Sequence, residues 1–266
     1  MQNQEVRSKV ARRLLIAGGI LFFVFLLLLV LSIMFADDLV DIFWYHSLGY
    51  ELYFWQRKLY RYIVFIAVLF LFFLVFFLNF WIASRFLKRS SQSVEDMPRK
   101  AYRKIYKAFQ TGSLIFYVPF SLALSIPIAM PLYHNWEKFL FYVFGPSMGV
   151  SDTFYGKDVS FYLFSFPIYT LIQRWLLIAF LILLIGLFVL YMVKNRLQTR
   201  HALHFGRGAK WHLSILVLII FFIEIWDFML QRYALLYDTS HEPLFYGPGY
   251  VQINVIRPFI WGSLVL

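Results

Sequence analysis

The sequence contains no cysteine, and several common functional motifs are also missing from it. Without cysteine the chain forms no disulfide, holds no thiolate-bound metal or iron–sulfur cluster and has no cysteine nucleophile. Its histidines show no metal-ligand pattern: His201 and His204 have no carboxylate nearby, and His46 and His134 are isolated. Walker loops, HExxH and GxSxG do not occur either. We therefore predict no metal, no cofactor, no catalytic residue and no enzymatic activity.

Hydrophobic sequence is abundant instead. Of 266 residues, 61% are hydrophobic and 22% aromatic, whereas soluble domains are about 45–50% apolar. The apolar residues gather into long runs without charge, and a helix needs about 20 such residues to cross a bilayer. We predict an all-α fold, a polytopic transmembrane helical bundle with interfacial aromatic helices that forms a single membrane domain over 1–266.

The apolar runs place the expected spans. Pro119, Pro127 and Pro131 should kink the third span, and Pro167 suits the first turn of the fourth. A partial sixth segment, 251–266, is too short to cross, so the end of the chain resembles a truncation. The five expected full spans are about 14–36, 62–84, 111–133, 167–193 and 213–233.

The formal net charge of +11 has a simple membrane explanation. Lysine and arginine concentrate before the first span, between 85 and 107, and between 194 and 210, while the alternate connectors hold fewer. Basic residues near span ends favour the cytoplasmic side, so we expect a multi-pass protein of the cell inner (cytoplasmic) membrane with a cytoplasmic amino terminus. The charge therefore predicts no nucleic-acid partner.

The first apolar run is longer than the apolar part of a cleavable signal peptide, so we interpret it as an uncleaved first span.

Two segments beside the spans have distinct patterns. Residues 93–109 place lysine and arginine on one helical face and apolar residues on the other, which suits a helix on an anionic leaflet or an ordinary basic connector. Residues 37–62 mix tryptophan, tyrosine and phenylalanine with charges such as Asp41 and Lys58. Since these rings favour the bilayer interface, we expect an interfacial helix or a helical hairpin in 37–62.

The stretch "GKDVSFYLFSFPIY", residues 156–169, sets Lys157 and Asp158 before an aromatic run. Its rings suit headgroup depth, and Asp158 is placed to cap the turn that follows. We interpret the stretch as a structural anchor of an external loop, with a ligand site as the alternative. Together with Arg174 and Arg257 near external span ends, Lys157 and Asp158 are our candidate loop and partner contacts.

The fifth span carries acids at membrane depth. Glu224 and Asp227 share a helix face, and Gln231 follows Asp227 by one turn. Because an acid at the bilayer centre costs about 2.5–3.5 kcal/mol on insertion scales, it should face a cavity or a basic partner such as Arg232, Arg174 or Arg257. The set Glu224, Asp227, Gln231 and Arg232 is either an ion, proton or substrate pathway or a structural ion-pair network.

Several stretches carry a family resemblance. The strings "YGKDVSFYLFSFP", "LQRYALLY", "YGPGYVQINVIRP" and "WYHSLGYELYFW" resemble elements of uncharacterised protein family 182, large bacterial and archaeal integral membrane proteins of unassigned function. The chain departs from the family pattern at Gln231, where the family has aspartate, at Tyr155, where it has phenylalanine, and at Pro248, where it has alanine. The resemblance therefore carries over to Gln231 no role that rests on that aspartate, and Asp227, one turn earlier, is the candidate substitute.

The resemblance implies an amino-terminal membrane bundle followed by a large extracytoplasmic region. That region is absent here, so the chain is a fragment, a short member or one half of a split protein. We expect a scaffold or subunit of a cell-envelope membrane complex, with the lipid bilayer and other membrane or envelope proteins as partners. A transporter or channel component that uses Glu224 and Asp227 is the alternative. A lipid- or glycan-active enzyme comes third, with only Glu137, Asp152, Asp158 and Asp238 as loose candidates.

Overall fold

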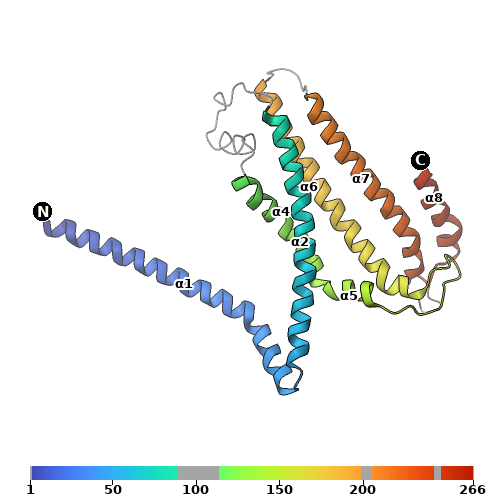
Figure 1. The fold of residues 1–266 in the computed structure, drawn as a ribbon, viewed down its shortest axis with the longest axis horizontal. Coiled ribbons are helices and arrows are strands. Elements are labelled where there is room, and N and C mark those ends of the chain that lie inside the picture. Colours follow the sequence, from blue (N-terminus) through green and yellow to red (C-terminus); the bar gives the residue numbers. More distant parts are fainter. Residues whose placement is uncertain (1, 89–113, 199–204, 243–246, 266) are drawn as a thin grey trace. The chain divides into compact units, whose positions relative to one another are not determined.

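The computed structural model describes residues 2–88, 114–198, 205–242 and 247–265. Within these ranges the chain is a succession of helices without a strand (Figure 1), so the all-α fold class is confirmed. The predicted basic amphipathic helix at 93–109 lies outside the described residues. The helices are α1 (Gln2–Ser47), α2 (Glu51–Lys88), α4 (Leu114–His134), α5 (Trp136–Phe144), α6 (Phe166–Gln198), α7 (Arg207–Ala234) and α8 (Arg257–Val265).

Among the described helices, 4 are long and apolar enough to cross a membrane. A fifth is added if the bent pair Leu21–Val30 and Phe35–Ser47, which are inclined at 46°, counts as one span. Three of these four helices begin well before the apolar run that marks them in the sequence, whereas Phe116–His134 lies almost entirely within its run of 111–133. The spanning helices are Glu51–Phe86, Phe116–His134, Phe161–Val193 and Arg207–Tyr237.

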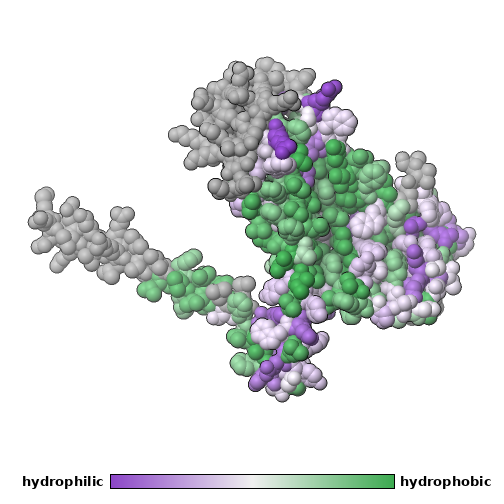
Figure 2. Space-filling view, in the orientation of Figure 1, coloured by the Kyte–Doolittle hydropathy of each residue, from purple (hydrophilic) through white to green (hydrophobic). Residues whose placement is uncertain are grey.

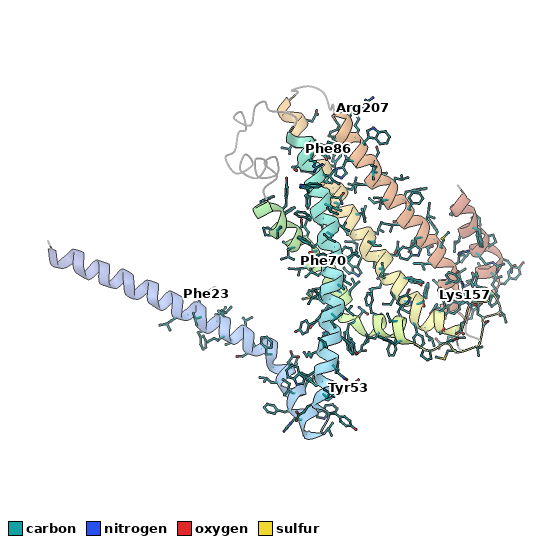
Figure 3. The ribbon with its side chains drawn as sticks, viewed as in Figure 1. Phe23, Tyr53, Phe70, Phe86, Lys157 and Arg207 are labelled. Carbon is teal, nitrogen blue, oxygen red and sulfur yellow. The ribbon has the colours of Figure 1, made fainter. Side chains whose placement is uncertain are left out.

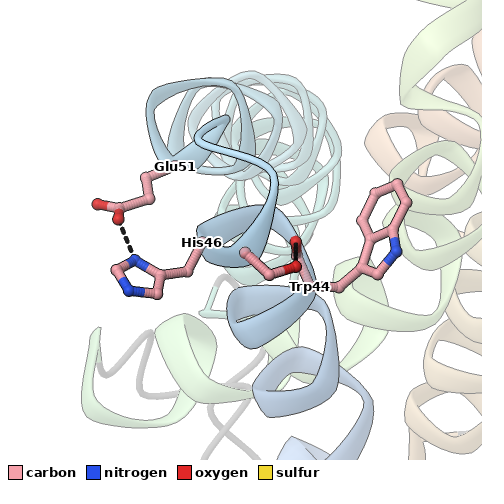
Figure 4. Close-up of polar contacts among 4 residues, drawn as sticks. Trp44, His46 and Glu51 are labelled. Carbon is pink, nitrogen blue, oxygen red and sulfur yellow. Dashed lines mark hydrogen bonds and ion pairs between the residues drawn. The ribbon is translucent and has the colours of Figure 1, made fainter.

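The chain divides into two compact units, Met1–Tyr60 and Arg61–Leu266. The first contains a helical hairpin, one of the two forms expected for 37–62. The hairpin turns at Gly49, whose φ of 74° is a left-handed conformation that glycine adopts without strain. Lys58 pairs with Asp38 across the hairpin. His46 pairs with Glu51 at its tip, beside the bond from the Ser47 hydroxyl to the Trp44 carbonyl (Figure 4).

The second unit has a core of phenylalanine, leucine and small residues at helical spacing. Phe72, Phe76 and Phe80 of α2 pack with residues of α4, α6 and α7, and Ala83 and Ala179 are fully buried. Small residues at such contacts let helix backbones approach closely, which favours packing where lipid supplies no hydrophobic drive. The space-filling view shows a wide apolar surface over these helices (Figure 2).

Two short π-helices precede prolines. Phe161–Ser165 leads into α6 just before Pro167, and Gln252–Ile256 leads into α8 just before Pro258. A proline ring clashes with the carbonyl four residues earlier in an ordinary α-helix, and the wider π turn relieves such a clash. In each case the backbone N–H that follows bonds the carbonyl five residues back. Helix geometry therefore changes at the start of α6 and at the start of α8.

The second unit has two distinct ends. Phe86 and Arg207 lie at one end, and Lys157 lies at the other (Figure 3). We call the latter the loop end. It comprises α5, residues 145–165, the carboxyl end of α7 from Gln231, and residues 235–242 and 247–261. Lys157, Asp158, Arg232 and Arg257 are all part of it.

Candidate functional site

The candidate site is the loop end, and its centre is a small hairpin of backbone around Asp152. Ser151 and Asp158 form an isolated antiparallel bridge. The Asp152 carboxylate accepts hydrogen bonds from the backbone N–H groups of Phe154 at 2.7 Å, Tyr155 at 2.6 Å and Lys157 at 2.9 Å. Gly156, with φ of 64°, supplies the left-handed residue that closes the turn. The sequence SDTFYGKD thus folds around its own first aspartate.

The same carboxylate has a further partner and an altered acidity. The Tyr162 hydroxyl donates to it at 2.7 Å. Partial desolvation favours the neutral acid, but the bonds from Tyr162 and from the backbone N–H groups outweigh it, so the pKa of Asp152 lies below its ordinary value. Asp152 is therefore an ionised structural anchor of the turn.

Asp158 organises the other side of the hairpin. It accepts bonds from Ser160 N at 2.7 Å, the Ser147 hydroxyl at 2.8 Å, Gly149 N at 2.9 Å and Met148 N at 3.2 Å. The bond from Ser160 N caps the helix that follows. These donors, with Ser160 N the strongest, hold the pKa of Asp158 well below its ordinary value. Both carboxylate oxygens of Asp158 therefore accept hydrogen bonds from the loop itself, which is the arrangement of a structural anchor.

The hairpin is tied to the end of α7 by tyrosines. The Tyr155 hydroxyl donates to the Arg232 carbonyl at 2.8 Å, and the Tyr237 hydroxyl donates to the Tyr162 carbonyl at 2.5 Å. The Tyr233 ring meets the Tyr155 ring edge-on at 5.2 Å between centroids. Aromatic pairs of this kind add about 0.5–1.5 kcal/mol beyond burial. The stretches YGKDVSFY and LQRYALLY therefore form one packed unit.

The third stretch, YGPGYVQINVIRP, joins them at the same end. The Asp238 carboxylate accepts from Ser240 N and from the Ser240 hydroxyl, both at 3.0 Å, and from the Gln252 amide. Arg232 lies over the Trp261 ring of α8, 4.4 Å from its centroid. A cavity of about 480 Å³ opens between α7 and α8. Its lining comprises Gln231, Ala234, Leu235, Tyr237, Asp238, Gln252, Ile256 and Ile260.

The predicted membrane-depth residues do not gather into one cluster. Gln231 donates to the Asp227 carboxylate at 2.6 Å, one turn apart on α7. Arg232 turns instead to Trp261. Glu224 is half-buried, and within the described part of the chain it has no hydrogen-bond or ion-pair partner. The structure therefore brings Asp227 and Gln231 together and leaves Glu224 apart from the arginines.

The predicted loop contacts Lys157, Arg257 and Arg174 differ in exposure and lie on different elements. Lys157 is exposed, with its ammonium 5.7 Å from the centre of the Phe161 ring. Arg257 is half-buried at the start of α8. Arg174 is exposed on α6, and among the described residues it has no bonding partner. Their roles as ligand or partner contacts stay predictions.

One polar cluster escaped the sequence analysis. At the opposite end of the second unit, His212 of α7 is buried, with Nδ1 2.8 Å from the Tyr191 hydroxyl and Nε2 3.1 Å from Asn79 Oδ1. Because the Asn79 amide nitrogen donates to the Val75 carbonyl, Asn79 Oδ1 is the acceptor, and His212 Nε2 carries the proton. The feature of the sequence that could have indicated this cluster is Asn79, a single amide side chain within an apolar run. The cluster joins α2, α6 and α7.

Among the described residues, no group of histidine and acidic side chains is arranged to hold a metal ion.

The loop end is a hydrogen-bonded aromatic platform at the end of apolar helices. This arrangement defines the class: a helical membrane protein with an ordered loop platform. Residues 18–266 match the model of the Uncharacterised protein family (UPF0182), and the chain belongs to this family.

Curated relatives of this family include UPF0182 proteins of several bacteria. One from Nitrosococcus oceani is 51% identical over 97% of this chain and 30% of its own length. One from Syntrophobacter fumaroxidans is 53% identical over 86% and 26%, and one from Methylococcus capsulatus is 40% identical over 83% and 25%. This chain thus spans less than a third of the length of these relatives. No solved structure matches it.

Proposed function

We propose that this chain is a scaffold or subunit of a cell-envelope membrane complex and that the loop end is its docking platform. In this proposal the protein crosses the inner membrane several times with a cytoplasmic amino terminus, so the loop end faces outward. The observation that carries the proposal is the convergence of three separate stretches into one hydrogen-bonded platform. A preorganised surface loses little conformational entropy when a partner binds.

The chemistry of the platform supports docking over catalysis. Asp152, Asp158 and Asp238 accept bonds from their own loops, so their oxygens are engaged in structure. A general acid or base needs instead a group that reaches a substrate proton. The carboxylates therefore serve to hold the platform in shape.

Apolar side chains on the platform supply the contact surface. Phe154 is 44% exposed, Tyr250 79% and Phe259 72%. Aromatic side chains dominate the energetics of protein interfaces because they bury a large area with few rotatable bonds. Exposed apolar side chains of this kind, on a rigid base, suit a protein partner.

Site-specific photocrosslinking in cells tests this proposal. A benzophenone amino acid replaces Phe154 or Phe259 in the full chain, and Phe222 is the matched control. Phe222 is 60% exposed on α7, away from the platform. We expect discrete protein adducts at Phe154 and Phe259 and none at Phe222. Equal labelling at all sites, or no protein adduct at the platform, would reject a docking role.

Transport is the second candidate, and one observation favours it. Glu224 is half-buried without a polar partner among the described residues. Intramembrane acids of this kind mark ion and proton pathways. Asp227, bonded to Gln231, lies one turn away and would extend such a path toward the loop end.

Glu224→Gln and Asp227→Asn distinguish the two functions. Intact assembly with loss of ion or solute flux in proteoliposomes supports transport. Loss of assembly in the variants, together with no ion or solute flux in the unaltered chain, supports the scaffold. Asp37→Asn, at an exposed position of α1 outside the loop end, is the matched control and should change neither readout.

A further inference from the structure

Two arginines of the loop end lie near one indole ring. The Arg232 guanidinium of α7 lies 4.4 Å from the centre of the Trp261 ring. Arg257 stands four residues before Trp261 on α8, and residues at this spacing are neighbours on one helix face. Arg232 therefore lies over Trp261, and Arg257 lies on the same face of α8 as that ring.

Neither guanidinium has an ion-pair partner among the described residues. Within the described residues, the ion pairs join Asp38 to Lys58 and His46 to Glu51, and neither guanidinium takes part in one. Both arginines are half-buried. Two cations that share a desolvated surface repel each other, and an anion between them would relieve that repulsion.

The neighbouring tyrosine reports both charges. Burial raises the pKa of Tyr155, while the positive charges of Arg257 and Arg232 act on it in the opposite sense. Tyr155 also bonds the Arg232 carbonyl. Both charges are therefore felt at the same hydroxyl group. The negative charge of Asp152 also acts on Tyr155, but within the described residues Asp152 forms no ion pair with either guanidinium.

The surroundings suggest what the anion is. The Arg232 guanidinium lies over both the Tyr233 ring and the Trp261 ring, near the end of the spanning helix Arg207–Tyr237. Aromatic side chains at span ends sit at headgroup depth. A guanidinium binds phosphate through paired N–H groups in matching geometry.

We infer that Arg232 and Arg257, on the Trp261 face of the loop end, form a binding site for a phosphate group, supplied by the headgroup of a membrane phospholipid. The site does not depend on the docking proposal, since it requires the bilayer alone. It accounts for two half-buried cations that, among the described residues, form no ion pair near the end of a membrane span. The phosphate oxygens would accept the guanidinium N–H groups, and the indole ring would keep Arg232 in place.

Native mass spectrometry on the delipidated full chain tests the site. The protein is titrated with phosphatidylglycerol, with diacylglycerol, which lacks phosphate, and with inorganic phosphate as competitor. Arg232→Gln and Arg257→Gln are compared with Arg174→Gln, an exposed arginine elsewhere on the bundle. We expect saturable phosphatidylglycerol binding that each site variant weakens about tenfold or more, as loss of a charge-assisted bidentate contact predicts. Arg174→Gln should bind as the unaltered chain does.

The outcomes separate the possible sources. If inorganic phosphate binds as tightly as phosphatidylglycerol and displaces it at millimolar concentration, the phosphate site stands but the lipid is rejected as the source of the phosphate. Equal binding of diacylglycerol, or equal weakening by Arg174→Gln, would overturn the site. If Arg232→Gln fails to fold, Arg257→Gln and Arg257→Lys decide. The lysine variant should bind between the glutamine variant and the unaltered chain, because it keeps charge without the paired donors.

Discussion

The Tyr155 hydroxyl donates a hydrogen bond of 2.8 Å to the backbone carbonyl of Arg232, which joins positions 77 residues apart. One partner belongs to the loop before α6 and the other to the last turn of α7. The bond therefore holds two stretches of the family resemblance in one unit. It also identifies the side chain whose loss should separate them.

Tyr155→Phe should weaken the platform without removing its ring packing. The variant keeps the edge-on contact with Tyr233 but loses the hydroxyl, and a hydrogen bond of this kind contributes about 0.5–1.5 kcal/mol. Thermal unfolding in detergent should show a corresponding loss of stability. Tyr250→Phe, at an exposed tyrosine, is the control. Equal effects of the two variants would contradict the proposed tie.

The loop hairpin should loosen in acid. The folded-state pKa values of Asp152 and Asp158 are lowered, so their contribution to stability is fully present above the unfolded-state pKa near 4 and is lost as pH falls through the lower folded-state values. Amide exchange of residues 148–160, corrected for intrinsic rates, should therefore accelerate below about pH 4. Asp158→Asn should reduce that dependence, because it removes one titrating group.

Glu137→Gln is the control for this measurement. Glu137 is exposed on α5 and, within the described part of the chain, accepts no side-chain hydrogen bond. The variant should retain the pH dependence of the hairpin. A hairpin whose protection is the same at pH 7 and at pH 3 would show that the aspartates do not stabilise it.

The His212 cluster should show coupling between its members. His212→Leu leaves the Tyr191 hydroxyl and Asn79 Oδ1 without their partner. Interhelical hydrogen bonds in membranes measure about 0.6 kcal/mol on average and up to about 1.7. A double-mutant cycle of Tyr191→Phe and His212→Leu should return a coupling energy in that range. Additive effects would mean that the two side chains do not interact.

Gly208 is expected to tolerate no side chain. A Cβ atom there would lie 2.5 Å from the Phe86 ring, which approaches α7 from the end of α2. Overpacking of this kind costs about 1–3 kcal/mol, so Gly208→Ala should lower thermal stability. Gly186→Ala on α6, where nothing lies within 4 Å, should not lower it. A stable Gly208→Ala variant would place Phe86 elsewhere.

Much of the fold follows from the sequence because its cause is local. Long apolar runs without charge predict an all-α membrane fold, and the described residues confirm it with helices that are long and apolar enough to cross a membrane. Helix ends are less visible. α7 begins at Arg207, before the apolar run that starts at 213, because backbone hydrogen bonding continues where polarity changes. The charge pattern predicts where the apolar, lipid-facing part of the helix begins, but the helix itself starts before that point.

The candidate site was predicted in part. Asp158 and Arg257 were selected from the sequence, and the structure places both at the loop end. The expected grouping of Glu224 with Arg232 is not seen, since Arg232 turns toward Trp261. Helical periodicity relates residues within one helix, but it cannot say which neighbouring helix a long side chain reaches.

By itself the sequence determined that this chain forms apolar helices suited to a bilayer and that its family stretches flank them. The reason is that helix formation in lipid depends on the length and polarity of contiguous residues. Only the tertiary structure decided that Tyr155 meets the end of α7, that Arg232 lies on Trp261, and that His212 joins three helices. Those contacts depend on how distant segments pack.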